Sequence, residues 1–125
     1  MLKERCDISG GIRIPSIVDV NELIGFSRTQ GLLSSMEDRR QVRKDLLKTS
    51  NFNIVLICLE TGQEIPSRPE PYGVCFYVIS GKGTFSVGNE KVELTDRNMV
   101  FAPAGEARGI KSIERLTLLG IQDPH

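Results

Sequence analysis

Residues 62–83, which read G-Q-E-I-P-S-R-P-E-P-Y-G-V-C-F-Y-V-I-S-G-K-G, decide the fold of this chain. The stretch begins as a charged segment broken by glycine and proline, and it becomes an apolar, β-branched run at residues 74–79. A run of this kind predicts a buried strand, and the Gly-Lys-Gly that follows predicts a turn at its end. Side chains just before a buried strand are well placed to line a pocket, so Arg68, Glu70 and Tyr72 are the first candidates for a site.

The sequence on both sides of this stretch carries further strand signals. Apolar or β-branched runs occur at residues 51–59, 84–87, 91–94, 99–102 and 115–121. Gly88-Asn89 lies in the short gap between two of these runs, and glycine supplies the positive φ that a two-residue hairpin turn requires. About six short strands joined by turns, with almost no helix, predict an all-β sandwich or barrel.

On this pattern, residues from about 51 to 121 resemble a cupin, the small double-stranded β-helix or jelly-roll barrel. The first cupin motif starts with a glycine, continues with His-x-His and a glutamate, and ends on a second glycine. Gly62 and Gly81 match its two glycines. The second motif is Pro-x-Gly followed by a histidine, and Pro103-Ala104-Gly105 matches its turn. The resemblance therefore implies a cupin barrel over residues 41–125.

The residues at the metal-ligand positions of these motifs depart from the cupin pattern. Arg68 and Glu70 stand at the two histidines of the first motif, Val74 stands at its glutamate, and Arg108 stands at the histidine of the second motif. The iron, manganese, nickel or zinc usual in cupins needs these histidines and a carboxylate, whereas a guanidinium has no lone pair to offer. The resemblance implies the fold, and the substitutions predict that the chain binds no metal and no other cofactor.

The same positions predict a remodelled pocket at the mouth of the barrel. The expected ligand-binding residues are Arg68, Glu70, Tyr72, Phe76, Met99 and Arg108. One hypothesis is that one arginine pairs with Glu70 and the other binds a small carboxylate or phosphate. A second is a structural or interaction module whose Arg-Glu-Arg cluster fills its own pocket. A third is a metal-independent isomerase or epimerase with Glu70 as general base, although a non-catalytic barrel is the expectation.

The N-terminal third of the chain reads differently. We expect residues 1–40 to be an arm that packs on the barrel, with a helical turn over residues 18–26 that Asp19 or Asn21 caps and Gly25 stops. Residues 35–48 are ambiguous, because a Ser-x-x-Glu capping box and strong helix formers favour a helix. The resemblance to small cupins instead favours a strand over residues 41–49, with a helical turn before it.

Composition narrows the function classes. Sixteen basic residues balance sixteen acidic ones, so no overall field attracts nucleic acid. No apolar run reaches the length of about 20 residues that spans a bilayer, which predicts a soluble, cytoplasmic protein without a membrane partner. Three cysteines without a C-x-x-C pair argue against a disulfide framework, and Cys58 and Cys75 are expected to be buried hydrophobic residues. The one histidine, His125, is the last residue.

Small cupins commonly form homodimers through their outer sheet faces, and the resemblance implies the same here. The outward positions of the central strand, Cys75, Tyr77 and Ile79, are apolar, as a strand buried on both faces requires. The expected partners are therefore a second copy of the chain and a small anionic ligand.

Overall fold

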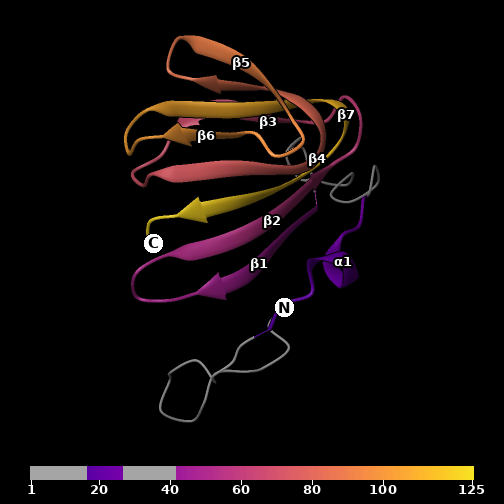
Figure 1. Ribbon diagram of the computed structural model, residues 1–125. Coiled ribbons are helices and arrows are strands. Elements are labelled where there is room, and N and C mark those ends of the chain that lie inside the picture. Colours follow the sequence, from indigo (N-terminus) through magenta and orange to yellow (C-terminus); the bar gives the residue numbers. More distant parts are fainter. Residues whose placement is uncertain (1–16, 27–41) are drawn as a thin grey trace, which may run out of the picture.

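The computed structural model describes residues 17–26 and 42–125 (Figure 1). In this part of the chain the elements are α1 (Val20–Leu23), β1 (Val42–Lys48), β2 (Asn53–Leu59), β3 (Glu64–Pro69), β4 (Val74–Val87), β5 (Glu90–Thr95), β6 (Met99–Ala102) and β7 (Ala107–Gln122). The all-β class is confirmed. The helical turn expected before residue 41 lies outside the described residues, and the division of the chain at residue 40 stays a prediction. The described helix has four residues, too few to cross a membrane.

Two long strands, β4 and β7, form the frame of the barrel and belong to both of its layers (Figure 1). The C-terminal half of β7 pairs with β2 and with the first half of β4, and this layer continues to β1 on one side and β6 on the other. The N-terminal half of β7 pairs with β3 and with the second half of β4, which in turn pairs with β5. This antiparallel arrangement is a double-stranded β-helix.

The predicted turn at Gly81-Lys82-Gly83 is wrong, because β4 continues through it to Val87. The ladder between β4 and β7 instead shifts register between Val78 and Gly83, which is where the strand passes from one layer to the other. Gly81 has a φ of 101°, and a Cβ at this position would overlap the carbonyl oxygen of Arg115. Glycine here makes a corner inside a strand, which has the same composition as a turn.

The charged segment after Gly62 is not irregular as predicted, because Glu64–Pro69 forms β3 against the start of β7. Its prolines hid the strand: a proline removes a ladder donor and is confined to edges and irregular positions. Here β3 pairs only with β7 among the described strands, and its register shifts between Ile65 and Arg68. The partner strand β7 also begins earlier than predicted, at Ala107 and not at residue 115.

The core lies between the two layers and follows the strand alternation. Its buried members are Val55, Ile57, Leu59, Val74, Phe76, Val78, Phe85, Leu94, Ala102, Ile110, Leu116 and Leu118. Val74, Phe76 and Val78 point inward, as their alternation with the outward positions 75, 77 and 79 predicts, and each is at most 7% exposed. The hairpin at Gly88-Asn89 is confirmed as well: Val87 pairs with Glu90, and Gly88 has a φ of 59°.

A second apolar cluster covers the outer face of β1 and β2. Leu46, Leu56 and Cys58 are buried there beneath apolar side chains from residues 17–26. The strand expected over residues 41–49 is confirmed as β1, and Asp19 caps α1 by accepting a hydrogen bond from the main-chain N–H of Asn21 at 3.0 Å. Local propensity favours a helix over these residues, but they form β1 because the strand buries Val42 and Leu46.

Because Cys58 is buried, we expect it to make the folded protein less stable as the pH becomes alkaline. Burial raises the pKa of its thiol, which is fully shielded from solvent. The unfolded thiol ionises above about pH 8.5, whereas the folded one ionises only at a higher pH, so stability is lost as the pH rises above that value. We expect the free energy of unfolding to fall between pH 8 and 10 more steeply than in Cys58→Ala, by up to about 1.4 kcal/mol per pH unit. Urea unfolding of both proteins measures it; parallel profiles would contradict it.

Candidate functional site

A cavity of about 50 Å³ opens at one end of the barrel. Its lining comes from β1, β2, β3, β4 and β7 and the segment before β4: Arg43, Ile57, Ile65, Pro66, Arg68, Glu70, Tyr72, Val74, Phe76, Arg108 and Gln122. Five of the six residues predicted for the site are among them. A larger hollow of about 380 Å³ runs along the other layer and is lined partly by Thr84 and Ser86. These hydroxyls alternate with the buried Phe85, so that hollow lies outside the barrel.

Arg108 is the most constrained charged group at this mouth. It lies near the start of β7 and is only 6% exposed. Its Nε donates to the carbonyl oxygen of Glu106 and its Nη2 donates to the carbonyl oxygen of Pro103, both at 2.8 Å. The remaining nitrogen, Nη1, is buried without a hydrogen-bond partner among the described residues. Two main-chain contacts thus fix the guanidinium while one donor is unused.

Arg68 and Glu70 form a pair at the outer edge of the same cavity. The Nε atom of Arg68 lies 2.7 Å from Oε2 of Glu70, and the two side chains are 63% and 22% exposed. The ion pairs of the described residues do not include Arg108. The carboxylate therefore neutralises the exposed arginine and not the buried one.

An aromatic stack borders the buried arginine. The ring of Tyr72 lies 3.8 Å from the imidazole of His125, at an interplanar angle of 12°. On the same tyrosine, the guanidinium carbon of Arg108 is 5.4 Å from the ring centroid. The tail that carries His125 is fixed by Asp123, whose carboxylate accepts from the main-chain N–H of Gly73 at 2.7 Å. The sequence suggests no role for His125, because it is the last residue of the chain. The tertiary fold places it against Tyr72, next to the site.

Two polar residues of the lining were missed by the sequence reasoning. Gln122 is 5% exposed, and its Oε1 is buried without a partner in the described part of the chain. Arg43, at the start of β1, is exposed. The sequence does contain a signal that Gln122 points inward, because it continues the alternation of Leu116, Leu118 and Gly120. The predicted strand ended at residue 121 and therefore left Gln122 out.

Met99 lies apart from the other predicted site residues. It does not line the cavity, and 58% of it is exposed. The register pairs it with Tyr77, whose neighbours Phe76 and Val78 point into the core. Directly paired residues share a sheet face, so Met99 and Tyr77 both point outward. The prediction for Phe76 fits better: its ring lines the cavity and contacts Phe85 at 5.8 Å between centroids.

The residues at the mouth do not fit the metal usual in cupins. Of Arg68, Glu70, Val74 and Arg108, only Glu70 carries a metal-binding atom, and its Oε2 already accepts from Arg68. Within residues 17–26 and 42–125, no three His, Cys, Asp or Glu side chains gather in a way that could hold an ion. The site chemistry is that of guanidinium groups.

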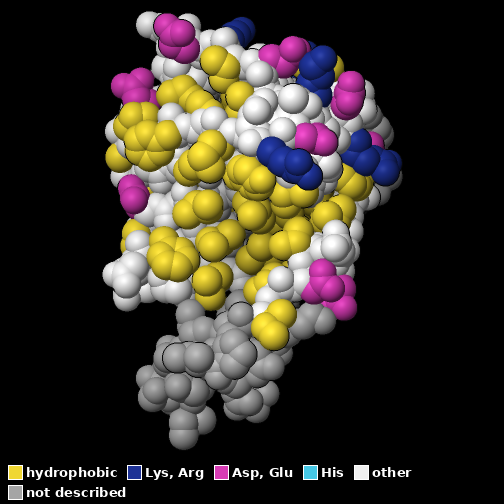
Figure 2. Space-filling view, viewed as in Figure 1, with side chains coloured by type: hydrophobic (Ala, Val, Ile, Leu, Met, Phe, Trp, Pro, Cys, Tyr) yellow, Lys and Arg dark blue, Asp and Glu magenta, His cyan; other side chains and the backbone are white. Residues whose placement is uncertain are grey.

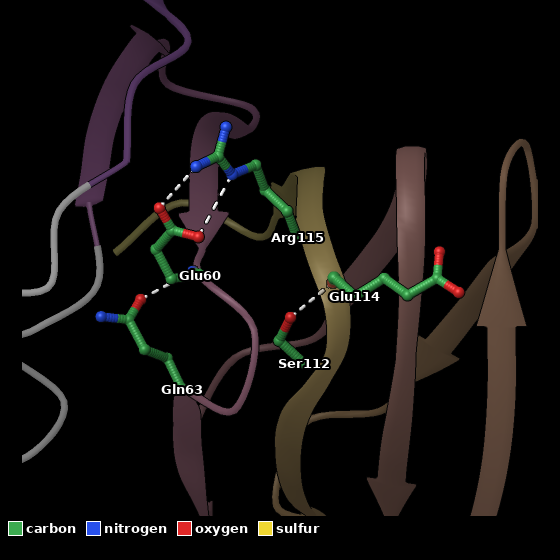
Figure 3. Close-up of polar contacts among 5 residues, drawn as sticks. All are labelled: Glu60, Gln63, Ser112, Glu114 and Arg115. Atoms are coloured by element: carbon green, nitrogen blue, oxygen red, sulfur yellow. Dashed lines mark hydrogen bonds and ion pairs between the residues drawn. The ribbon is translucent and has the colours of Figure 1, made fainter.

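A second polar cluster, near the far end of β2 from the mouth, is internally paired (Figure 3). Arg115 holds both carboxylate oxygens of Glu60, at 3.1 Å and 2.7 Å, and this hydrogen bonding raises the pKa of the guanidinium. The main-chain N–H of Glu60 donates to Gln63, and the Ser112 hydroxyl donates to the carbonyl oxygen of Glu114 at 2.6 Å. These contacts hold together the turn after β2 and the middle of β7.

Solved structures resemble this fold at low sequence identity. A conserved protein of Streptococcus pyogenes matches 91% of each chain with a TM-score of 0.70 and 17% identity. A protein of Thermus thermophilus covers 86% of this chain and 96% of its own, with a TM-score of 0.73 and 21% identity. The cupin domain of Cnp3 from Schizosaccharomyces pombe covers 100% and 87%, with a TM-score of 0.67 and 18% identity. At these identities the likeness concerns the fold alone.

Sequence comparison adds the family. An uncharacterised protein of Streptomyces coelicolor is 28% identical over 79 residues, which is 62% of this chain and 75% of its own length. The model of the cupin domain matches residues 55–119, which include β3, β4 and both motif regions. With the barrel, the glycines of the two motifs and this match together, the chain belongs to the cupin family.

Proposed function

We propose that the barrel mouth binds a small organic anion, a carboxylate or a phosphate, without a metal. The observation that carries this proposal is the Arg108 guanidinium, buried and fixed by two main-chain carbonyls, with Nη1 unpaired in the described part of the chain. A buried charge is costly unless it is paired and hydrogen-bonded. An anionic oxygen at Nη1 would satisfy both requirements.

The charge balance of the lining supports an anion. Arg43, Arg68 and Arg108 face a single carboxylate, that of Glu70, which Arg68 already holds. The cavity of about 50 Å³ accommodates on the order of three to five water-sized groups. A ligand would therefore insert a head group the size of acetate or phosphate, while the rest of a larger molecule projected into solvent.

The test is a titration of protein purified without an affinity tag. Acetate, formate and inorganic phosphate are each added at constant ionic strength, with chloride as the matched control. At about 100 times its dissociation constant, a ligand stabilises the fold by roughly 2.7 kcal/mol. We expect at least one of the three to raise the melting temperature by several degrees above chloride. If none of them does so, the proposal fails.

Metal independence is measured on the same preparation. We expect elemental analysis to find no stoichiometric transition metal, and dialysis against EDTA to leave anion affinity unchanged. The reason is the donor set, since guanidinium groups cannot coordinate a cation. A bound metal at one per chain, or affinity lost on chelation, would contradict this part of the proposal.

We also propose that the outer face of the first layer mediates a homodimer. Two cross-strand rows on this face contain no charged side chain: Phe101, Cys75 and Ile121 in one, Met99, Tyr77 and Leu119 in the other. Met99, Phe101 and Ile121 are 58%, 61% and 39% exposed. Figure 2 shows hydrophobic side chains gathered on this side of the molecule. An uncharged, self-complementary face suits a second copy related by two-fold symmetry.

Light scattering of purified protein measures the dimer directly. We expect about twice the 13.9 kDa mass of the chain, and monomer for Phe101→Lys, because a lysine buried in this face would be desolvated without a partner. Val92→Lys is the matched control: Val92 is 39% exposed but lies on β5 in the other layer, so this variant should remain dimeric. A monomeric unmodified protein would refute the dimer.

A further inference from the structure

Two residues that line the same cavity each carry one buried polar atom, and the two atoms are of opposite character. Arg108 Nη1 can only donate a hydrogen bond, and Gln122 Oε1 can only accept one. Neither has a partner among the described residues, and the two residues are 6% and 5% exposed. Each unsatisfied buried group is destabilising by itself. A ligand that satisfies both must carry a hydrogen-bond acceptor and a hydrogen-bond donor, which is a more specific requirement than a negative charge alone.

We propose that this site takes a short hydroxycarboxylate. Its carboxylate accepts from Arg108 Nη1, and its hydroxyl donates to Gln122 Oε1. This inference rests on the anion binding proposed above and specifies the ligand class. A plain carboxylate such as acetate would satisfy only the arginine and would leave the Gln122 oxygen buried and unpaired. A hydroxyl in reach of Gln122 completes the set.

The main chain of Gln122 is held on both sides by neighbouring strands. Its Cα is paired with Asn53 of β2 on one side and with Val74 of β4 on the other, so it sits in a central strand. The amide nitrogen of Asn53 is directed to the imidazole of His125, 3.3 Å away. Gln122 therefore presents its oxygen from a rigid part of the barrel, where a mismatched ligand cannot be accommodated by movement of the main chain.

The charge and the size of the cavity limit which hydrogen-bond donor the ligand can carry. An ammonium group could also donate to Gln122, but Arg43, Arg68 and Arg108 line the cavity against one carboxylate, which opposes a second cation. The small volume of the cavity requires that donor and carboxylate be only one or two carbons apart. These constraints favour a hydroxy acid such as glycolate or 3-hydroxypropanoate over an amino acid or a long chain.

The experiment compares ligands by calorimetric titration of the unmodified protein. Glycolate and acetate form one pair, 3-hydroxypropanoate and propanoate form the other, and glycine and methoxyacetate complete the set. We expect at least one hydroxy acid to bind about tenfold more tightly than its plain counterpart, as one buried hydrogen bond gained implies. Glycine and methoxyacetate should show no such gain, since one adds a cation and the other has lost the hydroxyl hydrogen.

A variant assigns the preference to Gln122. Gln122→Met keeps the length of the side chain but removes the oxygen, so we expect hydroxy and plain acids to bind within about twofold of each other. Preference that persists undiminished in this variant overturns the assignment. If the variant does not fold, the methoxyacetate comparison still decides: equal affinity for glycolate and methoxyacetate overturns the proposal.

The outcomes separate this inference from the proposed function. Acetate and propanoate that both bind as tightly as their hydroxy counterparts refute the hydroxycarboxylate and leave anion binding intact. Absence of binding by every carboxylate refutes the hydroxycarboxylate, and absence of phosphate binding as well refutes both. Tight glycolate or 3-hydroxypropanoate binding that depends on Gln122 supports both.

Discussion

Gly81→Ala is expected to unfold the barrel, or to lower its free energy of unfolding by at least about 4 kcal/mol. Gly81 has a φ of 101°, and its Cβ would overlap the carbonyl oxygen of Arg115 and lie 2.8 Å from the Cα of Leu116. These obstacles are main-chain atoms, which cannot rotate away as a side chain could. Leu116 is itself fully buried in the core, so a shift of β7 would disturb the packing between the layers.

Gly62→Ala is the matched control for this loss. Gly62 also has a positive φ, 84°, but a Cβ there would meet nothing within 4 Å. Its replacement should cost only the conformational strain of a left-handed alanine, about 1–2 kcal/mol. Urea unfolding of both variants, followed by circular dichroism, separates strain from overlap. Equal losses in the two variants would show that the close approach at Gly81 is not what fixes the corner.

Arg108→Met is expected to weaken anion binding by at least about 30-fold, which corresponds to roughly 2 kcal/mol. The substitution removes the buried donor that would face the anion while it keeps an apolar stem of similar length. Arg108→Lys should retain part of the affinity, because an ammonium keeps the charge but not the fixed planar fork. Calorimetric titration with acetate or inorganic phosphate, whichever binds the unmodified protein, measures all three proteins.

Arg97→Gln controls for loss of overall charge. Arg97 is an exposed residue between β5 and β6 and does not line the cavity, so we expect its affinity to match the unmodified protein within about twofold at physiological ionic strength. Similar weakening in Arg97→Gln and Arg108→Met would mean that the anion responds to net charge rather than to a site. Anion binding that Arg108→Met leaves unchanged would move the site away from this mouth.

Most of the fold could be predicted because its signals are local. The β-branched run at residues 53–59, the hairpin at Gly88 and the inward alternation of Val74, Phe76 and Val78 each specify their structure within a few residues. The errors came where one local signal has two meanings. Glycines at 81 and 83 mark a corner within β4 and not its end, and the prolines of β3 mark an irregular strand and not a loop.

The candidate site was predictable in part, through the spacing of the two cupin motifs. That spacing brought Arg68, Glu70 and Arg108 to one mouth, but it could not say which arginine the carboxylate holds. Met99 was assigned to the cavity wall because it is apolar and lies in a strand. Its direction depends on pairing with Tyr77, a residue more than 20 positions earlier, and the pairing turns it outward.

The sequence by itself determined the class of barrel, the places of most of its strands and the residues that stand at the cupin metal-ligand positions, because strand alternation, glycine positions and motif spacing are properties of nearby residues. The tertiary structure alone decided which polar atoms at the mouth are left unpaired. Gln122 reaches that mouth only because β7 lies between β2 and β4, and Arg108 is buried where β7 pairs with Arg68 of β3 and Val87 of β4. Burial and pairing of a polar group depend on strands far apart in the chain, so they follow from register and not from spacing.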